Sequence, residues 1–158
     1  MADEIIGVYD NTVARLEAMV CDRPHDGTKR LVHDLTVYEA NDWNSIDRPT
    51  RKFMLVPTGQ RNLGGTMMQD RLPGEVDDTL LLMVLYKQGA SPIDLYKVIM
   101  SDFDRITYQL SVTAGFQTPT STLSRRLLTN YSPVFDPGGS EGVAIVTASI
   151  AVTYIPTF

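Results

Sequence analysis

The sequence predicts an α+β fold: a mostly antiparallel β-sheet packed on one side by two α-helices, with a long mobile loop between strands. Two segments carry apolar residues at three- and four-residue spacing, which is typical of helices that bury one face. The last segment, 142–158, alternates with a period of two, as strands do. The order of the predicted elements is helix, strands, loop, strand, helix and strands, which is an α+β plan.

The length and composition of the chain fit one globular domain, 1–158. The chain has 158 residues, of which 43% are hydrophobic and 21% charged. Its 14 basic and 19 acidic residues give a net charge of −5, which argues against binding nucleic acid by neutralising phosphates. A single cysteine, Cys21, excludes an internal disulfide and a cysteine-rich zinc site. Without a basic signal-peptide segment or an apolar run of ~20 residues, we expect a cytosolic protein and no membrane partner.

The first predicted element is a helix over residues 3–20. Its apolar stripe consists of Ile6, Tyr9, Val13, Leu16 and Val20. Pro24 and Gly27 in the sequence CDRPHDG are expected to end it. Residues 29–47 alternate loosely and are expected to be extended or an irregular strand. RKFMLVP, residues 51–57, predicts a clearer short strand.

A long loop is expected over residues 57–78, which contain four glycines and two prolines. Loops of this length in compact domains are usually functional or disordered. The sequence TLLLMVLYK, residues 79–87, follows and is apolar on both faces. It therefore predicts a central strand that is covered on both sides.

The second predicted helix begins at the sequence SPID. Ser91 is suited to the N-cap, Pro92 to the first helical position, and Asp94 completes a capping-box pattern. The stripe expected to face the sheet is Leu95, Ile99, Phe103, Ile106 and Leu110. The side chains expected to face solvent are Asp102, Asp104 and Arg105. Residues 111–133 are rich in Thr and Ser and predict a loop or an irregular strand around 123–131.

After a predicted turn at 136–142, the chain ends on a strand that is uncharged on both faces. One face is apolar: Ala144, Val146, Ala148, Ile150, Val152 and Tyr154. The other is small and hydroxylated in its middle, at Thr147, Ser149 and Thr153. What covers this second face is open, and one candidate is the loop predicted at 111–133.

Two groups of residues are candidates for chemistry. Glu75, Asp77 and Asp78 lie at the end of the long loop, where carboxylates can act in acid–base catalysis or hold a divalent cation. Their spacing fits no calcium loop, so a solvated or interface-facing acidic loop is preferred. Cys21 and His25 are four residues apart and could share a helix face as a nucleophile pair or half a metal site. A buried thiol beside a solvated histidine is the preferred interpretation.

The remaining polar groups suggest no active site. His33 and Asp34 are adjacent in an extended segment, so they face opposite ways and form no dyad. Small basic clusters occur at Arg48, Arg51 and Lys52, and at Arg125 and Arg126. We expect these clusters to form inter-subunit ion pairs with the acidic loop. No phosphate-loop or dinucleotide motif is present, and we predict no catalytic, cofactor-binding or metal-binding residues.

Four features together resemble the tail terminator proteins of long-tailed bacteriophages, also called minor tail protein U or tail completion proteins. These are the helix 3–20, the RKFMLVP strand with its long loop, the unit DDTLLLMVLYK–SPIDLYKVIMSDFDRI, and the closing DPGGSEGVAIVTASIAVTYI. The resemblance covers most of the chain. It lies in the order and size of the elements and in their pattern of apolar and polar residues, and it includes no diagnostic motif. Residues 23–50 and 111–133 match less closely. A longer middle section of this kind would suit contacts with the sheath of a contractile tail.

The resemblance implies a structural protein of the virion neck, assembled in the host cytoplasm. The family forms a ring, usually a hexamer, which sits on the tail tube, stops its polymerisation and offers its other face to the head connector. DNA would pass through the lumen without specific binding, and no catalytic residue is implied. The sheet would form the ring wall, and loop 57–78 would contact the tube or connector. The hydroxylated face of the last strand, at Thr147, Ser149 and Thr153, would lie against another subunit or line the lumen.

Two alternatives remain open. Within the same class, the chain could be a head–tail connector or a tail tube subunit. From a different class, it could be a small enzyme or ligand-binding domain that uses one of the two groups of candidate residues described above.

Overall fold

The computed structural model describes residues 3–34, 51–58, 62–63, 75–89, 91–112, 121–135 and 142–156. Its helices are α1 (Asp3–Ala18) and α3 (Pro92–Ser111). Its strands are β1 (Val20–His25), β2 (Thr28–Arg30), β3 (Val32–His33), β4 (Lys52–Pro57), β5 (Asn62–Leu63), β6 (Val76–Lys87), β7 (Ser121–Val134) and β8 (Val143–Pro156). Most of the predicted long loop, the predicted turn at 136–142 except its last residue, and residues 35–47 of the predicted extended segment lie outside the described ranges.

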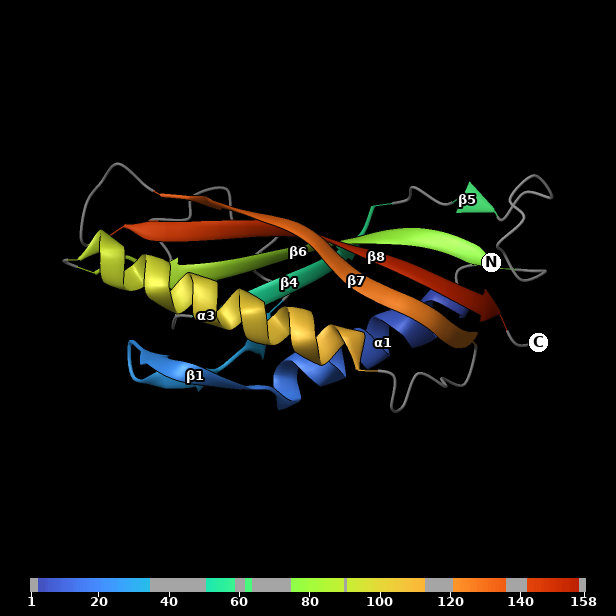
Figure 1. Ribbon diagram of the computed structural model, residues 1–158, viewed down its shortest axis with the longest axis horizontal. Coiled ribbons are helices and arrows are strands. Elements are labelled where there is room, and N and C mark those ends of the chain that lie inside the picture. The colour runs from blue at the N-terminus through green and yellow to red at the C-terminus, as the bar shows by residue number, and fades with distance from the viewer. Residues whose placement is uncertain are drawn as a thin grey trace.

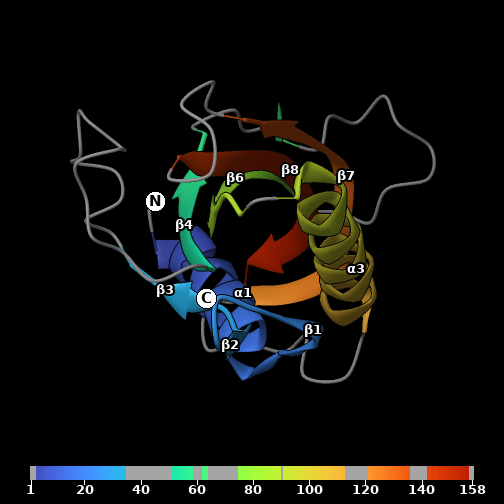
Figure 2. The same ribbon diagram turned by 90° about the vertical axis from the view of Figure 1, so that its left-hand side faces the viewer.

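One six-stranded sheet dominates the fold. Its order is β3–β4–β6–β8–β7, and β5 pairs with β6 beside this path. β3 runs parallel to β4, whereas the other pairs are antiparallel. Figures 1 and 2 show both helices on the same side of this curved sheet. The predicted α+β class, with a mostly antiparallel sheet covered on one side by two helices, is confirmed.

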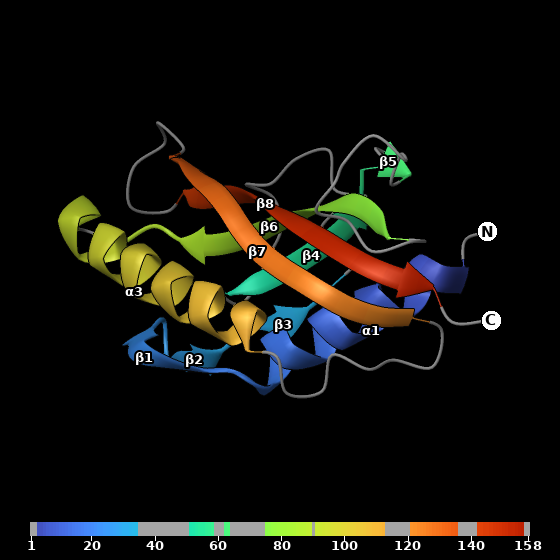
Figure 3. The same cartoon turned by 45° about the vertical axis from the view of Figure 1, so that its right-hand side comes forward.

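The core lies between the helices and the inner face of the sheet. β8 runs between β6 and β7 (Figure 3), and its even-numbered side chains from Ala144 to Tyr154 are all buried there. The α3 side chains that the sequence predicts to face the sheet are at most 2% exposed. Each large apolar side chain buried in this way stabilises the fold by about 1.5–3 kcal/mol, before chain entropy is subtracted. Neither described helix combines the length and the apolar composition needed to span a bilayer.

The start and core-facing stripe of α3 agree with the sequence, with one exception. Ser91 is the N-cap and its hydroxyl accepts a hydrogen bond from the backbone N–H of Asp94, at 3.4 Å. Pro92 occupies the first helical position. Asp102, however, is completely buried, although its spacing predicts a solvent-facing side chain. It is buried because Arg51 is buried opposite it.

α1 ends at Ala18, two residues before the predicted end, and its predicted core-facing stripe is confirmed at Tyr9, Val13 and Leu16 but not at its two ends. Its fully buried large side chains are Val8, Thr12 and Leu16. Ile6, which the sequence predicts to face the core, is 48% exposed, and Val20 is 44% exposed. The hydroxyl of Thr12 is satisfied inside the protein because it donates to the carbonyl of Val8, at 2.8 Å.

Residues 20–30 form a hairpin, whereas the sequence predicts a helix end followed by breakers. Asp26 and Gly27 have φ values of 49° and 75°. A two-residue type I′ turn requires positive φ at both central positions, and Asp-Gly is among the pairs that adopt it most readily. His25 pairs with Thr28 across this turn. The hairpin of β1 and β2 then packs beside α3 rather than joining the main sheet.

The largest departure from the sequence prediction is β7. Residues 121–134 form a 14-residue strand at the edge of the sheet, not a loop or a short irregular strand. Its pairing with β8 shifts register twice, between Leu123 and Arg125 and between Leu128 and Asn130. Since β7 lies in the same sheet as β8, residues 121–133 do not cover the second face of β8.

Candidate assembly surface

The predicted acidic cluster does not converge on a site. Asp77 and Asp78 belong to β6, not to a loop, so their side chains point to opposite faces of the sheet. Asp77 accepts a hydrogen bond from the hydroxyl of Thr153 at 2.8 Å, and Asp78 accepts one from Tyr154 at 3.0 Å. Glu75 accepts one from Ser124 at 3.1 Å. These carboxylates tie β6 to β8 and β7.

Cys21 and His25 are also held apart. Both lie on β1, and four residues of a strand span about 13 Å, so they cannot meet as they would on a helix. Cys21 is 1% exposed, and burial, reinforced by nearby Asp102, raises the pKa of its thiol to about 12. His25 Nε2 donates to the carbonyl of Lys87 at 2.7 Å. The thiol is therefore protonated at neutral pH and is a poor nucleophile.

Arg51 is the centre of a buried polar network that the sequence prediction missed. Its Nε and Nη2 donate to the two carboxylate oxygens of Asp102, at 2.9 and 3.0 Å. Its guanidinium also donates to the backbone carbonyls of Thr28 and Arg23 in the hairpin. The hydroxyl of Tyr86 donates to Asp102 at 2.8 Å, and burial together with that carboxylate raises the pKa of this phenol. The network joins the hairpin, β6 and α3.

Lys52 and Arg126 are likewise used within the chain, which contradicts the inter-subunit ion pairs expected for them. Arg125 is exposed, and the ion pair expected for it stays a prediction. Lys52 pairs with Asp34 at 2.7 Å. Arg126 is 2% exposed; its Nε donates to the carbonyl of Leu110 at 3.0 Å and its Nη1 to Asn11 and Thr12, each at 2.8 Å. Burial lowers the pKa of Arg126 to about 10, and the charge of Arg15 adds to this effect. Arg48 lies outside the described ranges.

Arg15 and Arg126 together bind the C-terminal end of α3. Arg15 Nη1 donates to the carbonyls of Gln109 and Val112, at 3.2 and 2.5 Å. These carbonyls and that of Leu110 have no partner in the helix itself, and the negative end of the helix dipole favours cations there. α1 and β7 are therefore attached to α3 by hydrogen bonds as well as by packing.

His33 forms no dyad with Asp34, as predicted from their adjacency. Its Nε2 lies 3.2 Å from the hydroxyl of Tyr9, and its ring packs 5.1 Å from that of Phe53. The histidine therefore contributes to packing between α1 and β4.

Exposed hydrophobic side chains gather on α3 and β7. Within the described ranges, ten large hydrophobic side chains are exposed, and seven of them belong to these two elements. They are Ile93, Tyr96, Met100, Tyr108, Leu127, Tyr131 and Val134. Isolated exposed hydrophobics are ordinary, but tyrosine and methionine concentrated on neighbouring elements are typical of protein interfaces. Tyr131 pairs with the core-facing Ala148 and so lies on the same side of the sheet as α3, whereas Leu127 and Val134 pair with Ala151 and Ile145 on the other face. We call the five residues on the helix side, Ile93, Tyr96, Met100, Tyr108 and Tyr131, the assembly surface.

Ring contacts connect the two halves of the assembly surface. The ring of Tyr96 on α3 lies 5.2 Å from that of Phe135, directly after β7. Tyr131 on β7 stacks at 4.7 Å on Phe103 of α3. The backbone edge of β7 is less suited to binding a further strand, because its two bulges interrupt a regular ladder. Contacts at this surface are therefore expected to be made mainly by side chains.

The face of the sheet opposite the helices is almost uncharged in its middle. There, Thr147 and Ser149 of β8 are half-buried, and no described helix packs over them. A second apolar cluster forms at one end of this face, where Met54 and Leu85 are buried. The two faces of β8 thus differ as the sequence predicts: one forms the core, and the other presents short uncharged side chains.

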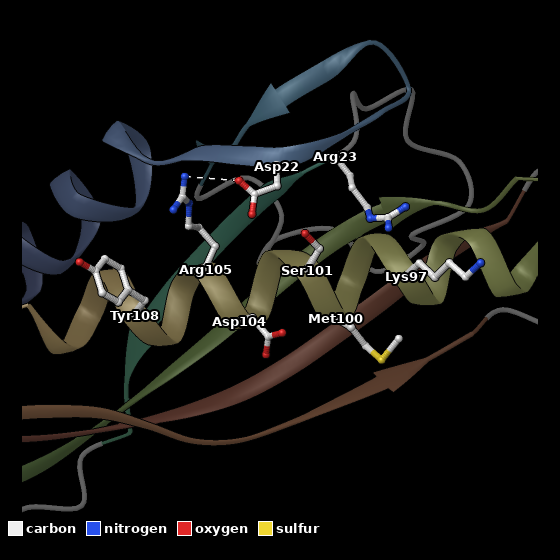
Figure 4. A pocket seen from close by; sticks show the side chains of 8 residues that line it. All are labelled: Asp22, Arg23, Lys97, Met100, Ser101, Asp104, Arg105 and Tyr108. Atoms are coloured by element: carbon white, nitrogen blue, oxygen red, sulfur yellow. Dashed lines mark ion pairs between the residues drawn. The ribbon is translucent and has the colours of Figure 1, made fainter.

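A hollow of about 460 Å³ lies between the hairpin and α3 (Figure 4). The hairpin contributes Asp22 and Arg23, and α3 contributes Lys97, Met100, Arg105 and Tyr108 among others. Arg105 pairs with Asp22 across the hollow at 3.3 Å. We call this hollow the α3 groove. Two of its residues, Met100 and Tyr108, belong to the assembly surface.

Neither a known family nor a metal site among the described residues indicates what the chain does. No protein-family model matches it, and no curated protein matches it. Among the described residues, no three His, Cys, Asp or Glu side chains come close enough together to hold a metal ion. The arrangement of its own exposed residues is therefore the basis for assigning a function.

Proposed function

We propose that the chain is a structural protein that assembles with copies of itself into a closed ring and terminates a phage tail tube. The assembly surface carries this proposal. It gathers five exposed hydrophobic side chains of α3 and β7 on the helix side of the sheet, in a chain whose candidate catalytic groups are dispersed or already hydrogen-bonded. Such a surface gains stability when a second protein covers it.

The resemblance to tail terminators supplies the proposed form of the assembly. A ring, a hexamer in view of that family, would cap the tail tube, stop its polymerisation and present its other face to the head connector. It would belong to the neck of the virion after assembly in the host cytoplasm, with a tail sheath as a further partner. The uncharged face around Thr147 and Ser149 would suit a wall past which DNA moves without being bound.

Two observations weaken the alternative of an enzyme or ligand-binding domain. Glu75, Asp77 and Asp78 each accept a hydrogen bond from a hydroxyl of β7 or β8. Cys21 is buried, protonated and separated from His25 along β1. Neither group offers reactive atoms to one substrate. A connector or tube subunit remains a competing proposal within the same class.

Negative-stain electron microscopy of the purified protein at about 1, 10 and 100 μM tests the proposal. We expect rings of a single diameter whose number, but not size, increases with concentration. Tubes that lengthen with concentration would replace the terminator by a tube subunit, because an unclosed head-to-tail contact propagates without limit. A monomer at every concentration would contradict self-assembly.

A further inference from the structure

α1 presents an exposed stripe of small, apolar and acidic side chains. Ile6, Asp10, Ala14 and Glu17 recur at helical spacing, and all four are exposed. The one basic side chain of α1, Arg15, points to the carbonyls at the end of α3 instead. We call these four exposed residues the α1 stripe. It carries two negative charges and no positive one.

The α3 groove has the opposite character. It is lined by three basic side chains, Arg23, Lys97 and Arg105, against two acidic ones. Arg105 is paired with Asp22, but Arg23 and Lys97 are exposed and form no ion pair with any described residue. The groove is therefore a locally basic, partly apolar hollow in a chain with a net charge of −5.

The two surfaces follow one another along the molecule. Figures 1 and 3 show the hairpin and α3 toward one end of the long axis and α1 toward the other. Both lie in the helical layer, on the same side of the sheet. A contact between the stripe of one copy and the groove of the next would therefore join unlike surfaces, which is the type of contact that generates rings when it closes.

We propose that the α3 groove binds the α1 stripe of a second copy of this chain. Asp10 and Glu17 would meet Arg23 and Lys97, while Ala14 leaves room for Met100. The proposal deepens the proposed ring function and rests on it, since it names the contact through which the copies associate. A second copy is the occupant because the chain itself carries the surface that complements the groove in charge and in side-chain size.

Reversing the charges on either surface tests this contact. The stripe variant is Asp10→Lys with Glu17→Lys, and the groove variant is Arg23→Glu with Lys97→Glu. All four side chains are exposed, so the fold and thermal stability should change little. We expect each variant alone to associate at least about tenfold more weakly than the wild type, measured by mass photometry and analytical ultracentrifugation.

Mixing the two variants provides the decisive arm of the experiment. In an equimolar mixture, the reversed stripe faces the reversed groove and the unchanged stripe faces the unchanged groove, so oligomers with both variants in equal amounts should return. The matched control is Lys29→Glu with Arg30→Glu, which reverses two exposed charges on β2 of the same hairpin without touching the groove lining. This control should assemble as the wild type does.

The outcomes separate the two proposals. If the wild type forms rings and the stripe and groove variants form them equally well, the contact is wrong and the ring function stands. If the wild type forms open-ended chains that the variants abolish and the mixture restores, the contact stands and the terminator function is wrong. If the wild type stays monomeric throughout, both are overturned.

Discussion

Arg51 looks like a surface residue in the sequence but is buried in the core of the structure. In the sequence it stands beside Lys52, which suggests a solvated basic cluster, and its partner Asp102 stands near Asp104 and Arg105 on a helix. The structure buries both completely and pairs them across 51 positions of sequence. Local spacing could not reveal this pairing, because burial of a charge depends on a partner supplied by the tertiary fold.

Removing one partner of this pair should strongly destabilise the protein. Asp102→Ala leaves the Arg51 guanidinium buried without its carboxylate, so we expect the free energy of unfolding to fall by about 3–5 kcal/mol in urea denaturation. The matched control is Lys87→Gln, which removes an exposed partner 4.0 Å from Asp26 and should cost less than about 1 kcal/mol. Equal losses in the two variants would show that the buried pair is unimportant.

The Cys21 thiol should make stability fall as the solution becomes alkaline. Its pKa is raised from 9.0 to about 12 in the folded chain, so the unfolded chain releases this proton first. Between these values the unfolded state binds fewer protons than the folded state, and stability therefore declines as pH rises.

Comparing the wild type with Cys21→Ala isolates the contribution of the thiol to this pH dependence. Tyr86 and Arg126, whose pKa values are also shifted, are present in both proteins and contribute to both profiles. Urea denaturation from pH 8 to pH 12 should show a steeper loss of stability for the wild type than for the variant. Parallel pH profiles would mean that the thiol is not protected from ionisation.

Among the elements, α3 was predictable and β7 was not. α3 combines an N-cap, a proline at the first position and a regular apolar stripe, so local and tertiary preferences agree. In β7 the two bulges shift the alternation of inward and outward side chains, and each shift inverts the pattern for the residues that follow. Arg126 also points toward the core, and this charged residue makes the buried face of β7 harder to recognise from the sequence.

The hairpin could have been predicted from the Asp26–Gly27 turn. We expect Gly27→Ala to destabilise the protein by about 1–2 kcal/mol, because Gly27 has a φ of 75° and other residues are strained there. Gly89→Ala is the matched control: an added Cβ would meet nothing within 4 Å at either position, but only Gly27 has a positive φ. If both variants unfold at the same urea concentration, the turn does not have the strained geometry described here.

At the scale of the molecule, the sequence predicted the fold class but not the surfaces that meet a partner. The α3 groove is formed by residues from the hairpin and from α3, about 80 positions apart, and only folding brings them together. The assembly surface likewise combines α3 with β7, which the sequence does not predict as a regular strand. Such surfaces depend on which side chains remain uncovered, and a single sequence does not indicate this.

We propose that copies of this chain close into one ring through unlike surfaces. The most direct test is native mass spectrometry of the wild type over a hundredfold range of concentration. We predict that the mass rises from that of the 17.6 kDa chain to one fixed multiple and then stays constant. A mass that grows without limit, or one that remains at 17.6 kDa at every concentration, would contradict the account.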